Sequence, residues 1–119
     1  MKNERQDLRA RTTDYALRII RLYEYLPKSG AVHVISHQLL RSGTSVGAHY
    51  RENCRAKSKA DFISKIEGAL QELEESVYWM ELPTQAEYTN EAKLSPLIKE
   101  SNELISIFVT MVKNTKLNR

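Results

Sequence analysis

Residues 38–52, QLLRSGTSVGAHYRE, and residues 65–79, KIEGALQELEESVYW, are the two segments that decide the fold of this chain. Apolar residues recur in both segments at steps of three and four, the spacing of one face of an α-helix. Gly43 and Gly47 lie inside the first pattern, where each glycine costs roughly 1 kcal/mol of helix stability relative to alanine. A soluble bundle requires neither these glycines nor charged residues beside its apolar face. The residues of these segments are therefore selected for something besides folding, and the candidates are catalysis, nucleic-acid binding and assembly.

The same spacing predicts four helices along the chain. Ser58 is expected to cap the third helix. Pro83 is expected to end that helix within a few residues, because proline lacks the N–H that a helix needs. The fourth helix has two alternative starts, either at Asn90 or at Ser95 with Pro96 in the first helical position. The predicted helices run from about residue 3 to 26, from 32 to 56, from 59 to about 83, and from between 90 and 96 to 116.

The arrangement of these helices follows from the lengths of the helices and of their connections. No segment alternates with the period of two that is typical of a strand. Short connections between long amphipathic helices favour antiparallel neighbours. The sequence therefore predicts an all-α fold, an up-down-up-down antiparallel four-helix bundle in which residues 1–119 form a single domain.

The composition excludes several classes of protein. Apolar residues make up 41% of the chain, but no run of them approaches the ~20 residues of a membrane-spanning helix. The N-terminal residues, MKNERQDLRA, lack the apolar stretch of a secretory signal. Cys54 is the only cysteine and has no partner for an internal disulfide. We therefore expect a cytoplasmic protein with no membrane partner.

Basic residues are concentrated in the first half of the chain. Residues 1–59 contain 12 Lys and Arg against 5 Asp and Glu, a net charge of +7, whereas residues 60–119 contain 6 against 10, a net charge of −4. Two explanations are open: oppositely charged helices pair within the domain, or a basic surface binds an acidic partner such as RNA or DNA through its phosphates. Few aromatic residues are interleaved, so base stacking is not indicated. The candidate nucleic-acid contacts are Arg9, Arg11, Arg18, Arg21, Arg51, Arg55, Lys57 and Lys59.

Small residues occupy one side of the second predicted helix, at Gly43, Gly47 and Ala48. Small side chains let another backbone approach closely, which offsets the lost helix propensity when the two surfaces pack well. The third helix offers Gly68 and Ala69 in return. We expect the second and third helices to cross tightly there, and close packing between subunits is the alternative.

Charged residues lie beside the apolar stripes of the same two helices. Glu72 and Glu75 are one turn apart and share a face. Glu52 would project from the facing helix, and Arg41 could bind one of the carboxylates through both guanidinium nitrogens. These four residues predict either a polar network between the helices or, as the alternative, a solvated acidic face on the third helix.

The sequence contains little that indicates catalysis. Di-iron bundles use Glu-x-x-His motifs, and no histidine follows a glutamate at that spacing. His33 and His37 are four residues apart and have no third ligand that the sequence suggests. The segment RSGTSVG has neither the Gly-Lys-Ser/Thr nor the preceding strand of a phosphate-binding loop. We therefore predict no enzymatic activity, no metal and no cofactor.

Two motifs in these helices resemble a known family, the four-helix bundle proteins encoded in intervening sequences of bacterial 23S ribosomal RNA genes, also called the S23 ribosomal protein family. The resemblance covers about two thirds of the chain. The family pattern Arg-Ser-x-x-Ser-Val-x-Ala-Asn followed by Glu is matched by Arg41, Ser42, Ser45, Val46, Ala48 and Glu52. The second family pattern has Ser, then Phe, Lys, Ala, Glu-x-x-Glu and Tyr-Trp. It is matched by Ser58, Phe62, Lys65, Ala69, Glu72, Glu75, Tyr78 and Trp79.

The chain departs from the family pattern at two neighbouring positions. His49 replaces the usual asparagine, so it must supply the hydrogen bonds of that residue within the network of Arg41 and the glutamates, or point elsewhere. Tyr50 replaces an aliphatic residue and changes the local packing.

The resemblance also implies an assembly and a setting. Family members look like bundles that associate into homopentameric rings. Similar bundles are accessory proteins of diversity-generating retroelements, where they bind a reverse transcriptase and nucleic acid. Three hypotheses follow: an oligomeric accessory factor that binds RNA or DNA, a structural or protein-binding oligomer, and, least supported, a carboxylate metal-binding bundle.

Overall fold

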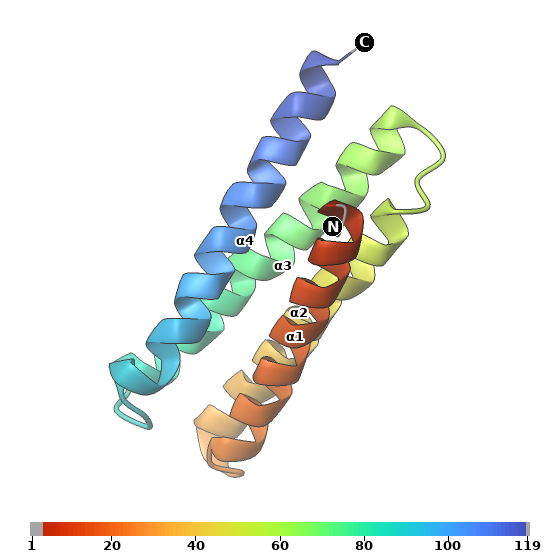
Figure 1. Ribbon diagram of the computed structural model, residues 1–119. Helices are drawn as coiled ribbons and strands as arrows, with labels where there is room; N and C mark the ends of the chain where they lie inside the picture. Colours follow the sequence, from red (N-terminus) through yellow and green to blue (C-terminus); the bar gives the residue numbers. More distant parts are fainter. Residues whose placement is uncertain (1–3, 119) are drawn as a thin grey trace.

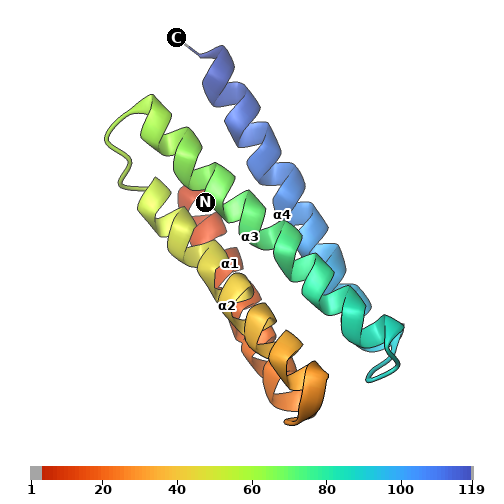
Figure 2. The same cartoon turned by 180° about the vertical axis from the view of Figure 1, so that it is seen from behind.

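The computed structural model describes residues 4–118 and forms four α-helices, with no strand in that range (Figure 1). The molecule measures 49 × 28 × 19 Å along its principal axes. The three connecting loops lie alternately at its two ends (Figures 1 and 2). The predictions of an all-α fold and of a helical bundle are therefore confirmed. The helices are α1 (Glu4–Tyr25), α2 (Gly30–Asn53), α3 (Lys59–Gln85) and α4 (Glu91–Leu117).

The starts of α3 and α4 follow the capping signals of the sequence. Ser58 caps α3 by accepting the N–H of Asp61 at 3.0 Å, as predicted. Pro83 lies inside α3, two residues before its end. Asn90 caps α4, and its side-chain oxygen accepts the N–H of Lys93 at 2.9 Å. The alternative start at Ser95 is therefore wrong, and Pro96 lies in the second turn of α4.

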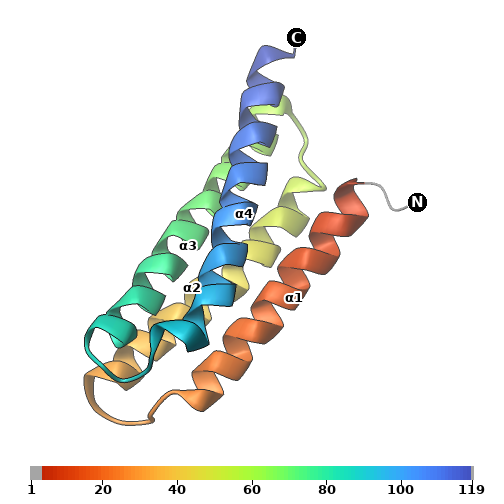
Figure 3. The same ribbon diagram turned by 60° about the vertical axis from the view of Figure 1, so that its left-hand side comes forward.

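Each helix packs along the next one in the sequence, and α2 and α3 share the most extensive interface. The backbones of α1 and α4 approach each other closely at only a few positions, and Figure 3 shows these two helices on the same side of the molecule. Long side chains join them: Arg11 on α1 donates two hydrogen bonds to the carboxylate of Glu100 on α4, at 2.6 and 3.1 Å. None of the helices within residues 4–118 is long and apolar enough to cross a membrane.

The core runs along the centre of the bundle and is built from all four helices. Tyr50 lies within it, with its ring stacked on Phe108 at 5.8 Å between ring centres and 19° between planes. Tyr50, which departs from the family pattern, therefore packs between α2 and α4. The largest fully buried side chains include Tyr15, Ile19, Leu39, Ile66, Leu73, Met80, Leu104 and Phe108.

Hydroxyl groups form a polar layer inside this core. Tyr15 on α1 and Ser101 on α4 share a hydrogen bond of 2.7 Å, and Ser42 on α2 and Ser76 on α3 share one of 2.8 Å. Burial raises the pKa of Tyr15, and hydrogen bonds from Ser101 and Ser76 partly oppose this rise. The layer therefore connects side chains of all four helices.

The glycines of α2 face a different neighbour from the one predicted. A Cβ atom on Gly43 would lie 2.6 Å from Ile19, and one on Gly47 would lie 3.3 Å from Thr12 Oγ1, so both glycines admit side chains of α1. The prediction that they make room for α3 is wrong. The close approach of α2 at Gly43 and Gly47 is to α1 of the same chain. Gly68 on α3 faces the ring of His49 on α2.

Candidate functional site

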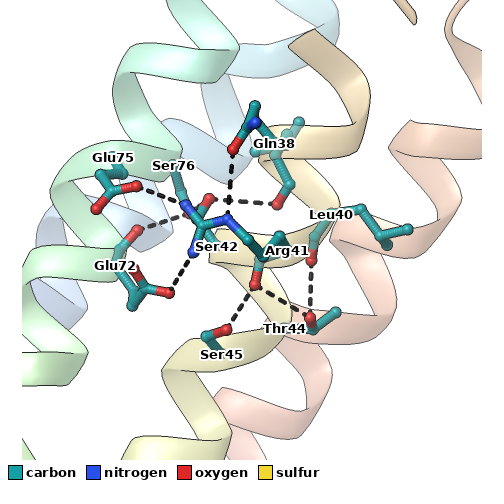
Figure 4. A network of polar contacts seen from close by, with 10 residues as sticks. Gln38, Leu40, Arg41, Ser42, Thr44, Ser45, Glu72, Glu75 and Ser76 are labelled. Atoms are coloured by element: carbon teal, nitrogen blue, oxygen red, sulfur yellow. Dashed lines mark hydrogen bonds and ion pairs between the residues drawn. The ribbon is translucent and has the colours of Figure 1, made fainter. Parts of the chain in front are cut away.

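Arg41 is the centre of a polar cluster between α2 and α3 (Figure 4). Its Nη1 lies 3.1 Å from Glu72 Oε2, and its Nη2 lies 2.7 Å from Glu75 Oε1. Its Nε donates to Gln38 Oε1 at 3.3 Å. One guanidinium therefore bridges two carboxylates that lie one turn apart on α3, while its own backbone stays on α2.

This cluster lies at the rim of the α2–α3 interface. The side chain of Glu72 is 11% exposed, but that of Arg41 is 50% exposed. The hydrogen bond with Glu75 is the main cause that raises the pKa of Arg41, and burial opposes it. Water therefore reaches the guanidinium, whereas Glu72 is buried, and the cluster joins the two helices with its cation solvated.

His49 and Glu52 form a separate pair. His49 Nδ1 lies 3.2 Å from Glu52 Oε1, one turn away on the same helix. Neither residue contacts Arg41 in the described hydrogen bonds or ion pairs, so the structure divides the five predicted network residues into two groups. Within residues 4–118, no three His, Cys, Asp or Glu side chains converge as metal ligands.

The predicted nucleic-acid contacts on α1 differ in whether a carboxylate lies beside them. Arg11 forms an ion pair with Glu100 and also lies 3.7 Å from Glu103. The hydrogen bond with Glu100 is the main cause that raises the pKa of Arg11. Arg18 lies 3.9 Å from Asp14. Arg18 and Arg21 line a small hollow between α1 and α4 together with Lys93. These residues therefore lie on the α1–α4 side, and Arg11 is occupied by carboxylates.

A second set of cations gathers at the end of the bundle that carries the α2–α3 loop. A hollow here is lined by Lys59 and Phe62 of α3 and by Thr115 of α4. Arg51 donates to Thr13 Oγ1 at 3.3 Å, which places the last turn of α2 beside α1. We call this region the basic end and define it by Arg51, Arg55, Lys57, Lys59, Lys113 and Lys116.

Most cations of the basic end are exposed and have few acidic partners. Among the described side chains, Arg55, Lys57 and Lys59 form no ion pair. Lys116 lies 3.9 Å from Glu67, and both side chains are more than half exposed. Asp61 accepts the main-chain N–H of Lys57. The end therefore presents a net positive surface.

The sequence did not identify two members of the basic end, Lys113 and Lys116. Both lie in the last turns of α4, far in sequence from residues 51–59. The predicted reversal of direction at each loop was the signal that could have found them, because it places the end of α4 beside the α2–α3 connection. Arg9 is exposed on α1 and has no ion pair with a described carboxylate.

Comparisons with known proteins agree with the fold. Residues 4–110 match the family described as 23S rRNA-intervening sequence protein. A crystal structure of a protein of unknown function from the S23 ribosomal protein family of Bacteroides thetaiotaomicron VPI-5482 is similar, with a TM-score of 0.82 and 36% sequence identity. The similarity covers 88% of this chain and 97% of that chain. No curated protein matches the sequence.

Proposed function

Because this chain belongs to the family of 23S rRNA-intervening sequence proteins, we propose that it is a non-enzymatic accessory protein that binds RNA or DNA through its basic end. In this proposal the chain is an up-down-up-down antiparallel bundle that self-associates. The family name refers to a gene for a structural RNA, and the related solved structure has no stated activity.

The observation that carries the proposal is the cluster of exposed cations at the basic end. Arg55, Lys57 and Lys59 lie within five residues of one another on the loop and the first turn of α3. Two lysines of α4, Lys113 and Lys116, lie close in sequence to Thr115, which lines the hollow. Cations without carboxylate partners gain the most from a phosphate, because no internal ion pair has to be broken first.

Binding of this kind depends on salt and only weakly on sequence. Each phosphate contact releases a condensed counterion, so the logarithm of the association constant falls by about 0.7–0.9 for each tenfold rise in salt and each contact. Phe62 is the one aromatic residue among those lining the hollow, and it is half-buried. We therefore expect phosphate contacts to dominate over base stacking.

A titration of fluorescently labelled RNA and of duplex DNA tests the proposal. Affinity should fall at least tenfold between about 50 and 200 mM salt if four or more phosphates are contacted. Absence of binding at the lower salt concentration would contradict nucleic-acid binding. Binding that does not change with salt would contradict the phosphate mechanism.

A second candidate, a structural or protein-binding oligomer, is favoured by the aromatic residues near the end of α3. Tyr78 is 53% exposed, and its ring centre lies 5.0 Å from that of Trp79. The indole N–H of Trp79 is buried and has no partner among the described residues. Such aromatic residues often anchor interfaces. The family resemblance gives a homopentamer as the expected assembly, and light scattering in solution distinguishes a ring from a stable monomer.

A further inference from the structure

Two side chains at the α1–α2 end of the bundle contact the Nε2 atom of His37. Tyr23 lies in the last turns of α1, and His33 and His37 lie in the first two turns of α2. The Nε2 atoms of the two histidines are 3.2 Å apart, and the hydroxyl oxygen of Tyr23 is 3.3 Å from His37 Nε2. The short turn between the helices therefore supplies the third donor that the sequence alone did not suggest.

The rings are held against one another. The ring centres of His33 and His37 lie 4.5 Å apart, and that of Tyr23 lies 5.4 Å from His37 and 6.0 Å from His33. His33 Nδ1 is buried without a partner among the described residues, whereas its Nε2 faces His37. Nε2 is therefore the nitrogen of His33 that is available to a ligand, and it faces Nε2 of His37.

We propose that His33 and His37 form a binding site for a divalent transition-metal ion, with the hydroxyl oxygen of Tyr23 as the third ligand. Zinc binds imidazole nitrogen at about 2.0–2.1 Å, so two nitrogens on one tetrahedral ion lie roughly 3.3 Å apart. On a square-planar ion such as Cu²⁺ the two nitrogens lie roughly 2.9 Å apart. The observed 3.2 Å falls between these values, so the spacing of the two nitrogens matches that of two nitrogens on one ion.

The donor set selects the class of metal. Two imidazoles suit Cu²⁺, Zn²⁺ and Ni²⁺, whereas Mg²⁺ and Ca²⁺ require mostly oxygen ligands. Tyr23 would bind as the phenolate, and its proton would pass to the solvent when the metal binds. His37 is exposed, which leaves the remaining positions of the ion open to water or to an external ligand. Lys28 is the nearby cation over the Tyr23 ring, and its ammonium donates to the main-chain carbonyls of Tyr23, Glu24 and Leu26.

Calorimetric titration of the untagged chain with ZnSO₄ and with CuSO₄ tests the site. We expect saturable binding of one ion per chain and no binding of Mg²⁺. His37→Gln should weaken binding about tenfold or more, and His33→Gln should do the same. The matched control is His49→Gln, which removes the third histidine of the chain and should leave the affinity within about twofold, well below the effect of losing a ligand.

Further measurements make the outcome decisive even if one variant folds poorly. Circular dichroism checks the helix content of each variant, and exposed His37 is the safer of the two substitutions. The electron paramagnetic resonance spectrum of the Cu²⁺ complex should show coupling to two imidazole nitrogens. Absence of saturable binding, or binding that survives both His33→Gln and His37→Gln, would overturn the proposal. Unchanged affinity in Tyr23→Phe would overturn the assignment of the third ligand.

Discussion

The hydroxyl of Tyr15 on α1 lies 2.7 Å from the hydroxyl of Ser101 on α4, inside a core where both residues are fully buried. Among the pairs of helices that lie against each other, this bond joins the pair whose backbones come close at the fewest positions. Ser101 also donates to the carbonyl of Leu97 at 2.9 Å, so the serine is satisfied within its own helix. The bond therefore contributes to the pairing of α1 with α4 more than to the helices themselves.

Tyr15→Phe should lower the free energy of unfolding by about 1–2 kcal/mol, because it leaves a buried hydroxyl of Ser101 with one partner fewer. Urea denaturation measures the loss. Tyr25→Phe, at a tyrosine that is 54% exposed, is the matched control and should change stability by less than about 0.5 kcal/mol. Equal effects of the two substitutions would show that the buried bond contributes nothing of its own.

The raised pKa of Tyr15 predicts a pH dependence. In the unfolded chain the phenol loses its proton near its ordinary pKa of 10.0, whereas buried Tyr15 keeps the proton to higher pH. The unfolded state therefore binds fewer protons, and the free energy of unfolding falls as pH rises above that value. Denaturation at about pH 9 and about pH 11 should show the stability difference between wild type and Tyr15→Phe shrinking with pH. A difference that stays constant would contradict the raised pKa.

Glu72→Ala should destabilise the bundle by about 1–2 kcal/mol. The loss is smaller than the roughly 3–5 kcal/mol expected when a fully buried partner is stranded, because Arg41 remains in contact with water. Glu74→Ala on the exposed face of α3 is the control, with an expected change within about 0.5 kcal/mol. Chemical denaturation measures both variants, and a loss above about 3 kcal/mol would place the Arg41 cluster deeper than the structure does.

Gly43→Ala should destabilise the protein by about 1–2 kcal/mol, because a new Cβ would lie 2.6 Å from the buried side chain of Ile19. Gly47→Ala is the matched comparison and should be near neutral, since its Cβ would meet Thr12 at 3.3 Å and helix propensity improves by roughly 1 kcal/mol. Ile19→Ala in the same chain should relieve the clash, so the double variant should be more stable than the sum of the single losses predicts. An additive result would contradict the contact.

Arg11→Gln separates a structural arginine from a phosphate-binding one. Its loss removes the paired hydrogen bonds to Glu100, which is 17% exposed, and should cost about 1–2 kcal/mol of stability. Affinity for nucleic acid is measured under conditions where the variant stays folded. It should remain within about twofold of wild type, because Arg11 is held by Glu100 and contacts no phosphate in this account. Loss of a phosphate contact would lower the affinity by more than that. A large loss of affinity with no change in stability would reverse this assignment.

The sequence predicted the helices well because spacing and caps act locally. Ser58 was identified as the cap of α3 from its position alone, and Asn90 was one of two alternatives for α4. What spacing cannot give is the identity of the neighbour. Gly43 has no side chain whose polarity would assign it to one face, so its contact with Ile19 on α1 required the packing of the whole bundle.

The candidate sites were predictable only in part, for the same reason. Arg41 and Glu72 lie on facing helices at matched heights, and the sequence could place them together. His49 could not be assigned, because its partner Glu52 lies on its own helix and competes with the cross-helix network. Tyr23 reaches the histidines only because of the geometry of the α1–α2 turn, which periodicity does not describe.

Two triple variants with equal charge changes test the central claim most directly. Arg55→Gln, Lys57→Gln and Lys59→Gln together neutralise the loop side of the basic end. Arg21→Gln, Lys93→Gln and Lys99→Gln together remove three exposed cations elsewhere. RNA affinity is measured for both variants and for the wild type over a series of salt concentrations.

The basic-end variant should bind RNA more weakly than the wild type. The slope of the logarithm of its association constant against the logarithm of the salt concentration should become shallower by about two, as expected for the loss of three phosphate contacts. The second variant should keep the slope of the wild type. Equal losses in both variants would contradict the account, because they would show attraction to overall charge and no binding at the basic end.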